Sequence, residues 1–332
     1  TRVVYVSTSG SNSNDGLSSS QPRLTIQGVI DFLQIYGPVV GRQQIVIAAG
    51  TYGEVVRIPN GLAMNDNYLE FKGPSGAGVR GTPTAIIDGT GMSTSSNGFS
   101  IESFNNVYIE YVLFQDWYDT GLGATAQVIS GVVVNEFATL YMYGCSGLGN
   151  GFANVYFLPL SNGIITGGIF SGARHGIDNT GGSLSFTASG ADYTTIKLAE
   201  EYGLHTKHQA STVLDLTEFL DNGLNAGATA YGAAIFAYKK NASVDTRECT
   251  FKRNNIAYNA RGGSISPHPD SPDTIGTGAD VNLRLWKIKG FGEDDLINYQ
   301  SLAGRELSLS FGGNSTTGAV AAVIFDTNAV IP

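Results

Sequence analysis

The sequence predicts an all-β fold, a right-handed parallel β-helix with three strands per coil and a short N-terminal capping helix. The first observation is a spacing of inward-facing residues, two then three then two, that recurs along the chain. Side chains two apart in a strand face the same way, and the three-residue step supplies the corner between two strands. The second observation is a glycine content of 44 in 332 residues, about twice the usual ~7%, which suits a chain with many tight corners.

The spacing occurs in eight segments whose first members lie 21 to 37 residues apart. The coil rhythm is therefore constant while the connecting loops vary in length. The segments are Val107-Ile109-Val112-Phe114, Leu140-Met142-Cys145-Gly147, Gly163-Ile165-Gly168-Phe170, Leu184-Phe186-Ser189-Ala191, Thr212-Leu214-Thr217-Phe219, Val244-Thr246-Cys249-Phe251, Val281-Leu283-Trp286-Ile288 and a weaker Leu307-Leu309-Gly312-Asn314. Stacked coils of this kind bury a continuous core that no single repeat could bury.

A third strand in each coil is indicated by an apolar residue that follows several segments after a turn. These residues are Leu122, Phe152, Ile177, Leu224, Ile256 and Leu296. The polar stretch Lys197 to Gln209, which contains His205 and His208, is expected to be a loop.

The N-terminal part is organised differently. Ile26, Val29, Ile30 and Leu33 fall on one helical face, so we expect a helix that begins near Thr25 and ends at Gly37-Pro38. Such a helix would cover the open end of the first coil. Short strands are expected at 44–52, 55–58, 68–71 and 85–88, with a Gly- and Pro-rich loop at 73–83.

No linker divides the chain. We therefore predict one continuous domain in which residues 1–60 form the N-terminal cap and first coils and residues 61–332 form the β-helix body. Because the chain begins at Thr1 without a methionine, we expect it to be a piece of a longer protein.

The two cysteines test the predicted stacking. Cys145 and Cys249 take the same position in segments four coils apart. With strands ~4.8 Å apart, the two residues should be separated by ~19 Å, whereas a disulfide needs Cα atoms within ~7 Å. We expect two free, buried thiols.

Charge and hydropathy exclude some partners. The formal net charge is -9, and nucleic-acid binding needs clustered Lys and Arg on a basic surface. The chain has no run of ~18 apolar residues, so no membrane span is predicted. No pattern predicts a cofactor or a metal ion, and the acidic run Glu293-Asp294-Asp295 is interpreted as a charged surface.

The first 90 residues resemble a known family. The residues that carry the likeness are Tyr5-Val6-Ser7-Thr8-Ser9-Gly10-Ser11-Asn12-Ser13-Asn14-Asp15-Gly16-Leu17, Pro22, Thr25-Ile26-Gln27, Ile30-Asp31 and Ala49-Gly50-Thr51-Tyr52. They are similar to the opening of right-handed β-helix domains in phage tail fibres and tailspikes, of the pectate-lyase-like superfamily. The resemblance implies a homotrimer on the virion, at the phage tail, next to other virion tail proteins. It also implies that a bacterial surface polysaccharide, capsule or O-antigen, is bound and cut.

Catalytic residues are sought in the turns, because equivalent turns of neighbouring coils line up along the axis. Glycoside hydrolysis uses two carboxyl groups ~5 to 9.5 Å apart, a distance that one or two coil steps supply. The candidate catalytic residues are Asp178, Asp221, Glu218, Asp119 and His175, and the candidate substrate-binding residues are Trp117, Tyr118, Arg174 and Tyr258. The preferred pair is Asp178 with Asp221 or Glu218, while the three aromatic residues are expected to be platforms for sugar rings.

Three functions remain open from the sequence. The first is a hydrolytic tailspike. The second is a lyase acting by β-elimination on a uronate, for which Arg174, Lys207, Lys252 and Arg253 supply basic groups. The third is a non-catalytic receptor-binding or structural fibre segment, in which the acids of the turns are only solvated side chains.

Overall fold

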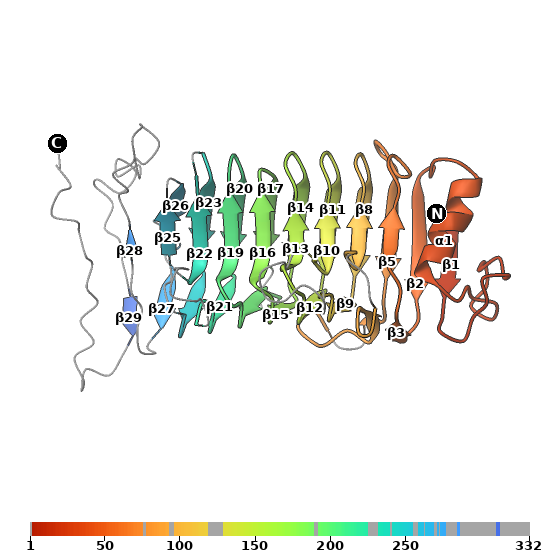
Figure 1. Ribbon diagram of the computed structural model, residues 1–332, viewed down its shortest axis with the longest axis horizontal. Helices are drawn as coiled ribbons and strands as arrows, with labels where there is room; N and C mark the ends of the chain where they lie inside the picture. The colour runs from red at the N-terminus through yellow and green to blue at the C-terminus, as the bar shows by residue number, and fades with distance from the viewer. Residues whose placement is uncertain are drawn as a thin grey trace.

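The chain forms an elongated stack of coils in the computed structural model, with the helix at one end and the C-terminal strands at the other (Figure 1). The structure describes residues 2–75, 78–92, 96–118, 129–188, 192–224, 232–239, 241–254, 258–261, 263–268, 271, 273–276, 284–285 and 310–312. Among these residues there is no helix with the length and apolar content needed to cross a membrane.

Three parallel sheets run the length of the stack. Sheet 1 contains, in spatial order, β1 (Arg2–Val6), β2 (Arg42–Ile47), β5 (Tyr68–Lys72), β8 (Asn106–Glu110), β11 (Thr139–Tyr143), β14 (Asn162–Thr166), β17 (Ser183–Thr187), β20 (Ser211–Asp215), β23 (Ser243–Arg247) and β26 (Ser264–Pro267).

The other two sheets pair in the same way. Sheet 2 contains β3 (Gly50–Tyr52), β6 (Ala85–Asp88), β9 (Val112–Gln115), β12 (Ser146–Leu148), β15 (Ile169–Ser171), β18 (Thr195–Lys197), β21 (Glu218–Leu220), β24 (Thr250–Lys252), β27 (Thr274–Gly276) and β29 (Ser310–Gly312). Sheet 3 contains β4 (Val56–Ile58), β7 (Phe99–Ile101), β10 (Val132–Val134), β13 (Ala153–Phe157), β16 (His175–Thr180), β19 (Tyr202–Lys207), β22 (Ala233–Tyr238), β25 (Tyr258–Arg261) and β28 (Arg284–Leu285).

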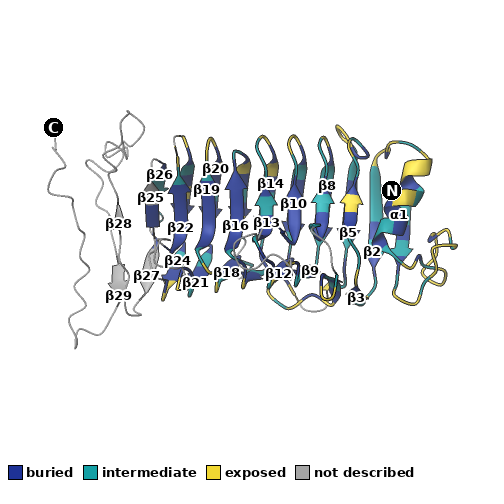
Figure 2. Cartoon of the chain, in the orientation of Figure 1, coloured by how far each residue is buried: buried dark blue, intermediate teal, exposed yellow. Residues whose placement is uncertain are grey.

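The fold is the predicted right-handed parallel β-helix with three strands per coil. Each coil visits sheets 1, 2 and 3 in turn, and every strand pairs with its equivalent in the next coil. The inward side chains form one continuous apolar core, which Figure 2 shows as buried strands beneath exposed turns. Repeated burial of this kind supplies the main stabilising free energy of a solenoid.

The helix α1 (Ile26–Ile35) covers the N-terminal end of the stack, as predicted (Figure 1). Thr25 is its N-cap, and the Thr25 side chain accepts a hydrogen bond from the Gly28 amide. The Glu54 carboxylate accepts hydrogen bonds from the Ile26 and Gln27 amides, each at 2.8 Å. An anion at this end of the helix also interacts favourably with the helix dipole, so Glu54 joins the cap to the first coil.

The predicted rhythm is confirmed in most coils and needs correction in five places. The spacing predicts Ser189 and Ala191 as the inward residues after Phe186, and both lie outside the described residues. The structure instead places Ile196 in register between Phe170 of the preceding coil and Phe219 of the following coil. A longer corner precedes β18, so the core position is reached later in the chain than the spacing predicts. The stretch 197–209 is not a loop, because it contains β19.

The other three corrections concern the part of the chain after β21. Leu224 is exposed and does not begin a strand, because β22 starts at Ala233. A complete coil was missed, in which Ile265 pairs with Val244 and Ile275 pairs with Phe251. Of the segment that begins at Val281, the structure describes Arg284–Leu285 as β28, which belongs to sheet 3. Leu122, Ile256 and Leu296 lie outside the described residues.

Both cysteines are free and buried, as predicted. Their segments adjoin β12 and β24, which are four strand steps apart in sheet 2. Burial raises the pKa of the Cys145 thiol to about 12, so this side chain is a neutral core residue at physiological pH.

We predict that Gly168→Ala strongly destabilises the solenoid. Gly168 has φ +88°, and a Cβ there would lie 1.7 Å from the Cys145 carbonyl oxygen. Backbone of one coil would have to move away from the next, so the free energy of unfolding should fall by about 3 kcal/mol or more. Urea denaturation measures the change. Gly53→Ala is the control, since a Cβ at Gly53 meets no heavy atom within 4 Å; equal stability of the two variants would contradict the prediction.

Candidate functional site

A local break in alternation brings two polar side chains to the outer face of β16. Gly176 and Ile177 both face inward: a Cβ on Gly176 would lie 2.5 Å from Ile196 Cγ2, and Ile177 is a fully buried core residue. With two consecutive inward positions, His175 and Asp178 both point outward although they are three residues apart. Only glycine fits at position 176, because the same Cβ would also lie 2.5 Å from the Gly203 carbonyl oxygen.

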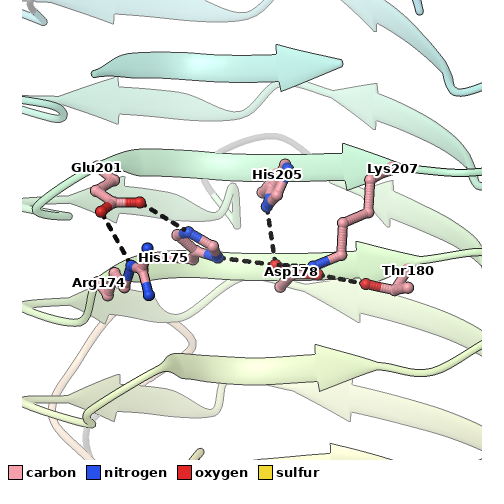
Figure 3. Close-up of polar contacts among 7 residues, drawn as sticks. All are labelled: Arg174, His175, Asp178, Thr180, Glu201, His205 and Lys207. Atoms are coloured by element: carbon pink, nitrogen blue, oxygen red, sulfur yellow. Dashed lines mark hydrogen bonds and ion pairs between the residues drawn. The ribbon is translucent and has the colours of Figure 1, made fainter. Parts of the chain in front are cut away.

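The next coil repeats this pattern in β19. Gly203 faces the core beside Phe219, and Leu204 is buried in it. Strand register then places His205 beside Asp178 and Lys207 beside Thr180. Two stretches 27 residues apart therefore contribute to one outward-facing group, which we name the outer-face cluster: Arg174, His175, Asp178, Thr180, Glu201, His205 and Lys207 (Figure 3).

Asp178 is the centre of the cluster and is completely buried. Its Oδ2 atom accepts hydrogen bonds from His175 Nδ1 at 2.8 Å and His205 Nδ1 at 2.9 Å, and it lies 3.3 Å from Lys207 Nζ. Its Oδ1 atom accepts a hydrogen bond from the Thr180 hydroxyl at 2.7 Å. Burial alone raises the pKa of Asp178, but the two imidazoles hold that pKa well below its usual value. Asp178 is therefore an ionised anchor.

A second carboxylate extends the cluster toward solvent. Glu201 Oε2 lies 3.4 Å from His175 Nε2, and Glu201 Oε1 accepts a hydrogen bond from Arg174 Nε at 3.0 Å. Half-burial raises the pKa of Glu201, but its bonds to His175 and Arg174 outweigh this and lower the pKa to about 2. His175 thus lies between two ionised carboxylates.

His205 has a buried ring nitrogen without a hydrogen-bond partner among the described residues. Because its Nδ1 donates to Asp178, the neutral ring has its lone pair on Nε2. That nitrogen is buried and has no hydrogen-bond partner among the described residues. Burial lowers the pKa of His205 to about 4 despite the neighbouring Asp178, so the ring is neutral at pH 7. His205 Nε2 can therefore act as a base or as a hydrogen-bond acceptor, and the bond from Nδ1 to Asp178 fixes the orientation of the ring.

Aromatic rings surround the charged groups. The Phe152 ring centroid lies 4.9 Å from His175, and Phe236 stacks on His205 at 5.3 Å. Tyr202 and Phe236 stack at 4.5 Å, and Tyr238 packs beside them. This apolar cluster lies outside the continuous core of the solenoid, so the outer face of sheet 3 combines rings with charges, as ligand sites do.

Three residues of the cluster offer metal ligands. Ligand atoms of His175, Asp178 and His205 all lie within 4.8 Å of one another, and imidazole with carboxylate is a donor set that transition metals accept. The Lys207 ammonium, however, already lies beside the same Asp178 oxygen. A positive charge at this position disfavours a cation and favours the hydrogen-bonded arrangement.

The structure brings together part of the predicted site. His175, Asp178 and Arg174 belong to the outer-face cluster. Glu218 and Asp221 do not pair with Asp178, because they lie on or just after β21 in sheet 2. There Glu218 binds Lys252 Nζ at 2.8 Å, and Asp221 forms a two-bond pair with Arg253, each bond 2.7 Å long.

Two predicted sugar platforms are wrong. Trp117 is buried in the core, where its indole Nε1 donates to the Ile87 carbonyl oxygen at 3.2 Å. Tyr258 is also buried, and its hydroxyl donates to Asp273. Both rings pack inside the solenoid and present no face to a ligand. Tyr118 is exposed and remains a prediction, while Asp119 lies outside the described residues.

The sequence interpretation missed Glu201, Thr180 and the role of His205. A signal was present in the alignment of His175-Gly176-Ile177-Asp178 with Tyr202-Gly203-Leu204-His205, a shared ring-Gly-aliphatic-polar pattern. Treating 197–209 as a loop hid this pattern, since the second copy lies within it.

Comparisons with known proteins do not place the chain in a family. No protein-family model and no curated protein matches it. Among solved structures, it is similar to pectate lyase Pel9A, with 15% identity, a TM-score of 0.46 and coverage of 85% of this chain and 77% of that chain. It is also similar to a pectin methylesterase from Aspergillus niger, with 13% identity, a TM-score of 0.44 and coverage of 92% and 94%.

A third similar structure is the GH136 lacto-N-biosidase from Eubacterium ramulus, with 11% identity, a TM-score of 0.44 and coverage of 84% of this chain and 64% of that chain. Likenesses of this degree carry no conclusion about activity. The fold itself rests on the strand pairing described above.

We predict that His205 makes the protein less stable between pH 6.5 and 4. The unfolded ring takes up a proton near pH 6.5, whereas the native ring does so only near pH 4. As pH falls through this window the unfolded state binds more protons, so stability decreases, by on the order of 3 kcal/mol in all. The depressed pKa of Asp178 acts only below this window, since its contribution is lost below about pH 4.

Urea denaturation across this pH range measures the effect. His205→Gln should remove most of the decrease, whatever its effect on stability at pH 7.5. His208→Gln is the matched control, because His208 is exposed three residues away. A full decrease that persists in His205→Gln would contradict the prediction.

Proposed function

We propose that the protein binds and cleaves a bacterial surface polysaccharide, capsule or O-antigen, at the outer-face cluster. The observation that carries the proposal is the open, buried Nε2 of a neutral His205 whose ring is fixed by Asp178. An unpartnered buried acceptor costs about 1–3 kcal/mol. A ligand that directs a hydroxyl group or an acidic C–H at Nε2 would supply the missing hydrogen-bond donor.

The surroundings of the cluster favour a sugar ligand. Sugars have apolar C–H faces and polar edges, and the outer face of sheet 3 offers both rings and charged groups. Lys207, Glu201 and Arg174 are the partly exposed members, with side chains 18%, 21% and 35% exposed, so a ligand would approach past them. The Lys207 ammonium lies 5.7 Å from the Phe152 ring and 5.8 Å from the Tyr156 ring, next to surfaces on which a pyranose could pack.

The charge states at this cluster favour elimination over hydrolysis. Hydrolysis needs a protonated carboxyl group to assist the leaving oxygen, but Asp178 and Glu201 both have lowered pKa values. Elimination needs a base and a cation that binds the uronate carboxylate. His205 Nε2 would take the proton next to that carboxylate. A carbon–carbon double bond would form as the bond to the leaving oxygen breaks, and water would donate a proton to that oxygen. Lys207 and Arg174 would supply positive charge for the carboxylate.

The biological setting that we propose is the phage tail. The opening of the chain resembles that of tailspike and tail-fibre β-helices, and an elongated solenoid suits a receptor-binding shaft. In that setting the protein is a homotrimer on the virion, in contact with other virion tail proteins. The specific support for this setting is the resemblance of the first 90 residues.

The test is incubation with purified capsule or lipopolysaccharide from candidate hosts, following reducing ends and ultraviolet absorbance together. Both signals would establish elimination, and reducing ends alone would establish hydrolysis. Binding to cells with neither signal would contradict cleavage and leave the non-catalytic receptor-binding segment.

Variants then connect the activity to the cluster. We expect His205→Ala to lower kcat/KM by about 10²- to 10⁴-fold, the usual contribution of a positioned base. Asp178→Asn should also lower the rate, because the ring of His205 loses its anchor, while polysaccharide binding is retained. His208→Ala should leave the rate unchanged. A fully active His205→Ala variant would show that the chemistry lies elsewhere.

A further inference from the structure

Five tyrosines gather on the outer side of sheet 1, on a different sheet from the outer-face cluster. Tyr68, Tyr108 and Tyr141 come from the neighbouring strands β5, β8 and β11, which are adjacent in Figure 1. The Tyr108 and Tyr141 rings stack with centroids 4.3 Å apart and planes 6° apart, and Tyr68 follows at 4.7 Å. Tyr111 and Tyr143 meet edge to face at 5.6 Å. All five, which we name the tyrosine patch, are half-buried.

The solenoid does not need these rings for its core. Their strand neighbours Phe71, Ile109 and Met142 point inward and are buried. In register with Tyr141, the following coils carry Ile164, Ser185 and Val213 at the same outward position. The same sheet thus forms in later coils with smaller outward side chains. The tyrosines are therefore not needed to form the sheet, and they are confined to this part of its outer surface.

One ring of the patch comes from a corner between sheets 1 and 2. Tyr111 has φ +54°, a left-handed conformation that Leu216 and Glu248 also adopt at the equivalent corners of later coils. Its ring occupies the space that a side chain at position 144 would fill, because a Cβ on Gly144 would lie 2.9 Å from Tyr111 Cδ1. Glycine at position 144 therefore makes room for the tyrosine ring of the previous coil.

The charges within the patch cancel one another. Arg42 pairs with Glu70, and Lys72 Nζ lies 2.8 Å from Glu110 Oε2. Burial and the neighbouring Tyr141 raise the pKa of Tyr108, so its hydroxyl stays neutral. The surface thus offers rings and neutral hydroxyl groups between closed ion pairs, with no excess of either sign to attract a charged polymer.

We propose that the tyrosine patch is a second glycan-binding surface, with a preference for neutral sugars, separate from the outer-face cluster. Tyrosine combines an apolar ring with a hydroxyl and loses little conformational entropy on binding, which suits a polyol with C–H faces and hydroxyl edges. A nucleic acid is disfavoured because the chain has a net charge of -9. The inference does not depend on cleavage at the outer-face cluster.

The test uses an array of purified neutral and anionic bacterial polysaccharides, probed with the His205→Ala protein so that cleavage cannot remove bound glycan. We expect binding to at least one neutral polysaccharide, with little dependence on salt. The double variant Tyr108→Ala/Tyr141→Ala should weaken this binding at least tenfold. The double variant Tyr108→Phe/Tyr141→Phe should lose less, because it keeps the rings.

The matched control is Ile164→Ala/Val213→Ala on the same face of sheet 1, which should bind as the parent protein does. Thermal melting checks that each variant is folded. Three results would overturn the proposal: no neutral polysaccharide is bound, the Tyr→Ala double variant binds as the parent does, or sedimentation shows that the double variant dissociates an oligomer. The last result would identify the patch as a subunit contact.

Discussion

The whole structure depends on the register between coils. Each strand pairs with its equivalent in the next coil, so inward side chains of successive coils pack on one another. Phe219 and Phe251 stack with ring centroids 5.1 Å apart and planes 2° apart. Asn222 Nδ2 donates a hydrogen bond to Asn254 Oδ1 at 2.9 Å. This bond joins two buried side-chain amides of neighbouring coils along the axis of the solenoid. A shift of one residue in any coil would turn these side chains outward.

The same register decides what the outer faces can do. A residue on one strand always meets residues that stand one coil earlier and later, at the spacing of a hydrogen-bonded pair of strands. In β16 and β19 the core takes two consecutive residues instead of alternate ones. That break gives the outer face a second polar residue within reach, and His175, Asp178 and His205 become mutual neighbours. The cluster thus follows from a detail of core packing that requires Gly176 and Gly203.

The sequence predicted the fold because the core repeats, and it predicted the site only in part because the outer faces do not. Positions such as Val107 and Phe114 are constrained by every neighbouring coil, so their spacing is visible in one chain. Ile196 was misaligned because corner length varies without changing the core. Asp178 was expected to pair with Asp221 or Glu218, but these two residues lie on or just after a strand of sheet 2. The pattern shows which residues face outward, but not which of the three sheets each of them adjoins. Trp117 was expected to be an exposed sugar platform because it follows a strand at a turn. Its ring instead points into the core, which the position of a residue in a turn does not exclude.

Many polar side chains of the solenoid satisfy one another, whereas Arg23, Gln43, Ser130 and His205 each have a buried polar atom without a hydrogen-bond partner among the described residues. Asp221 and Arg253 satisfy each other, as do Glu218 and Lys252, so they need nothing further. Arg23 also has a buried nitrogen without a partner, but its two terminal nitrogens donate to backbone oxygens at 2.7 and 2.8 Å. His205 differs because its open atom is the lone pair of a ring that Asp178 holds in place. A buried acceptor costs stability unless it is satisfied. Here the fold directs four donors to Asp178, from His175, His205, Lys207 and Thr180, while His205 Nε2 has no partner among the described residues. The proposed ligand would supply a proton or a hydroxyl to that atom.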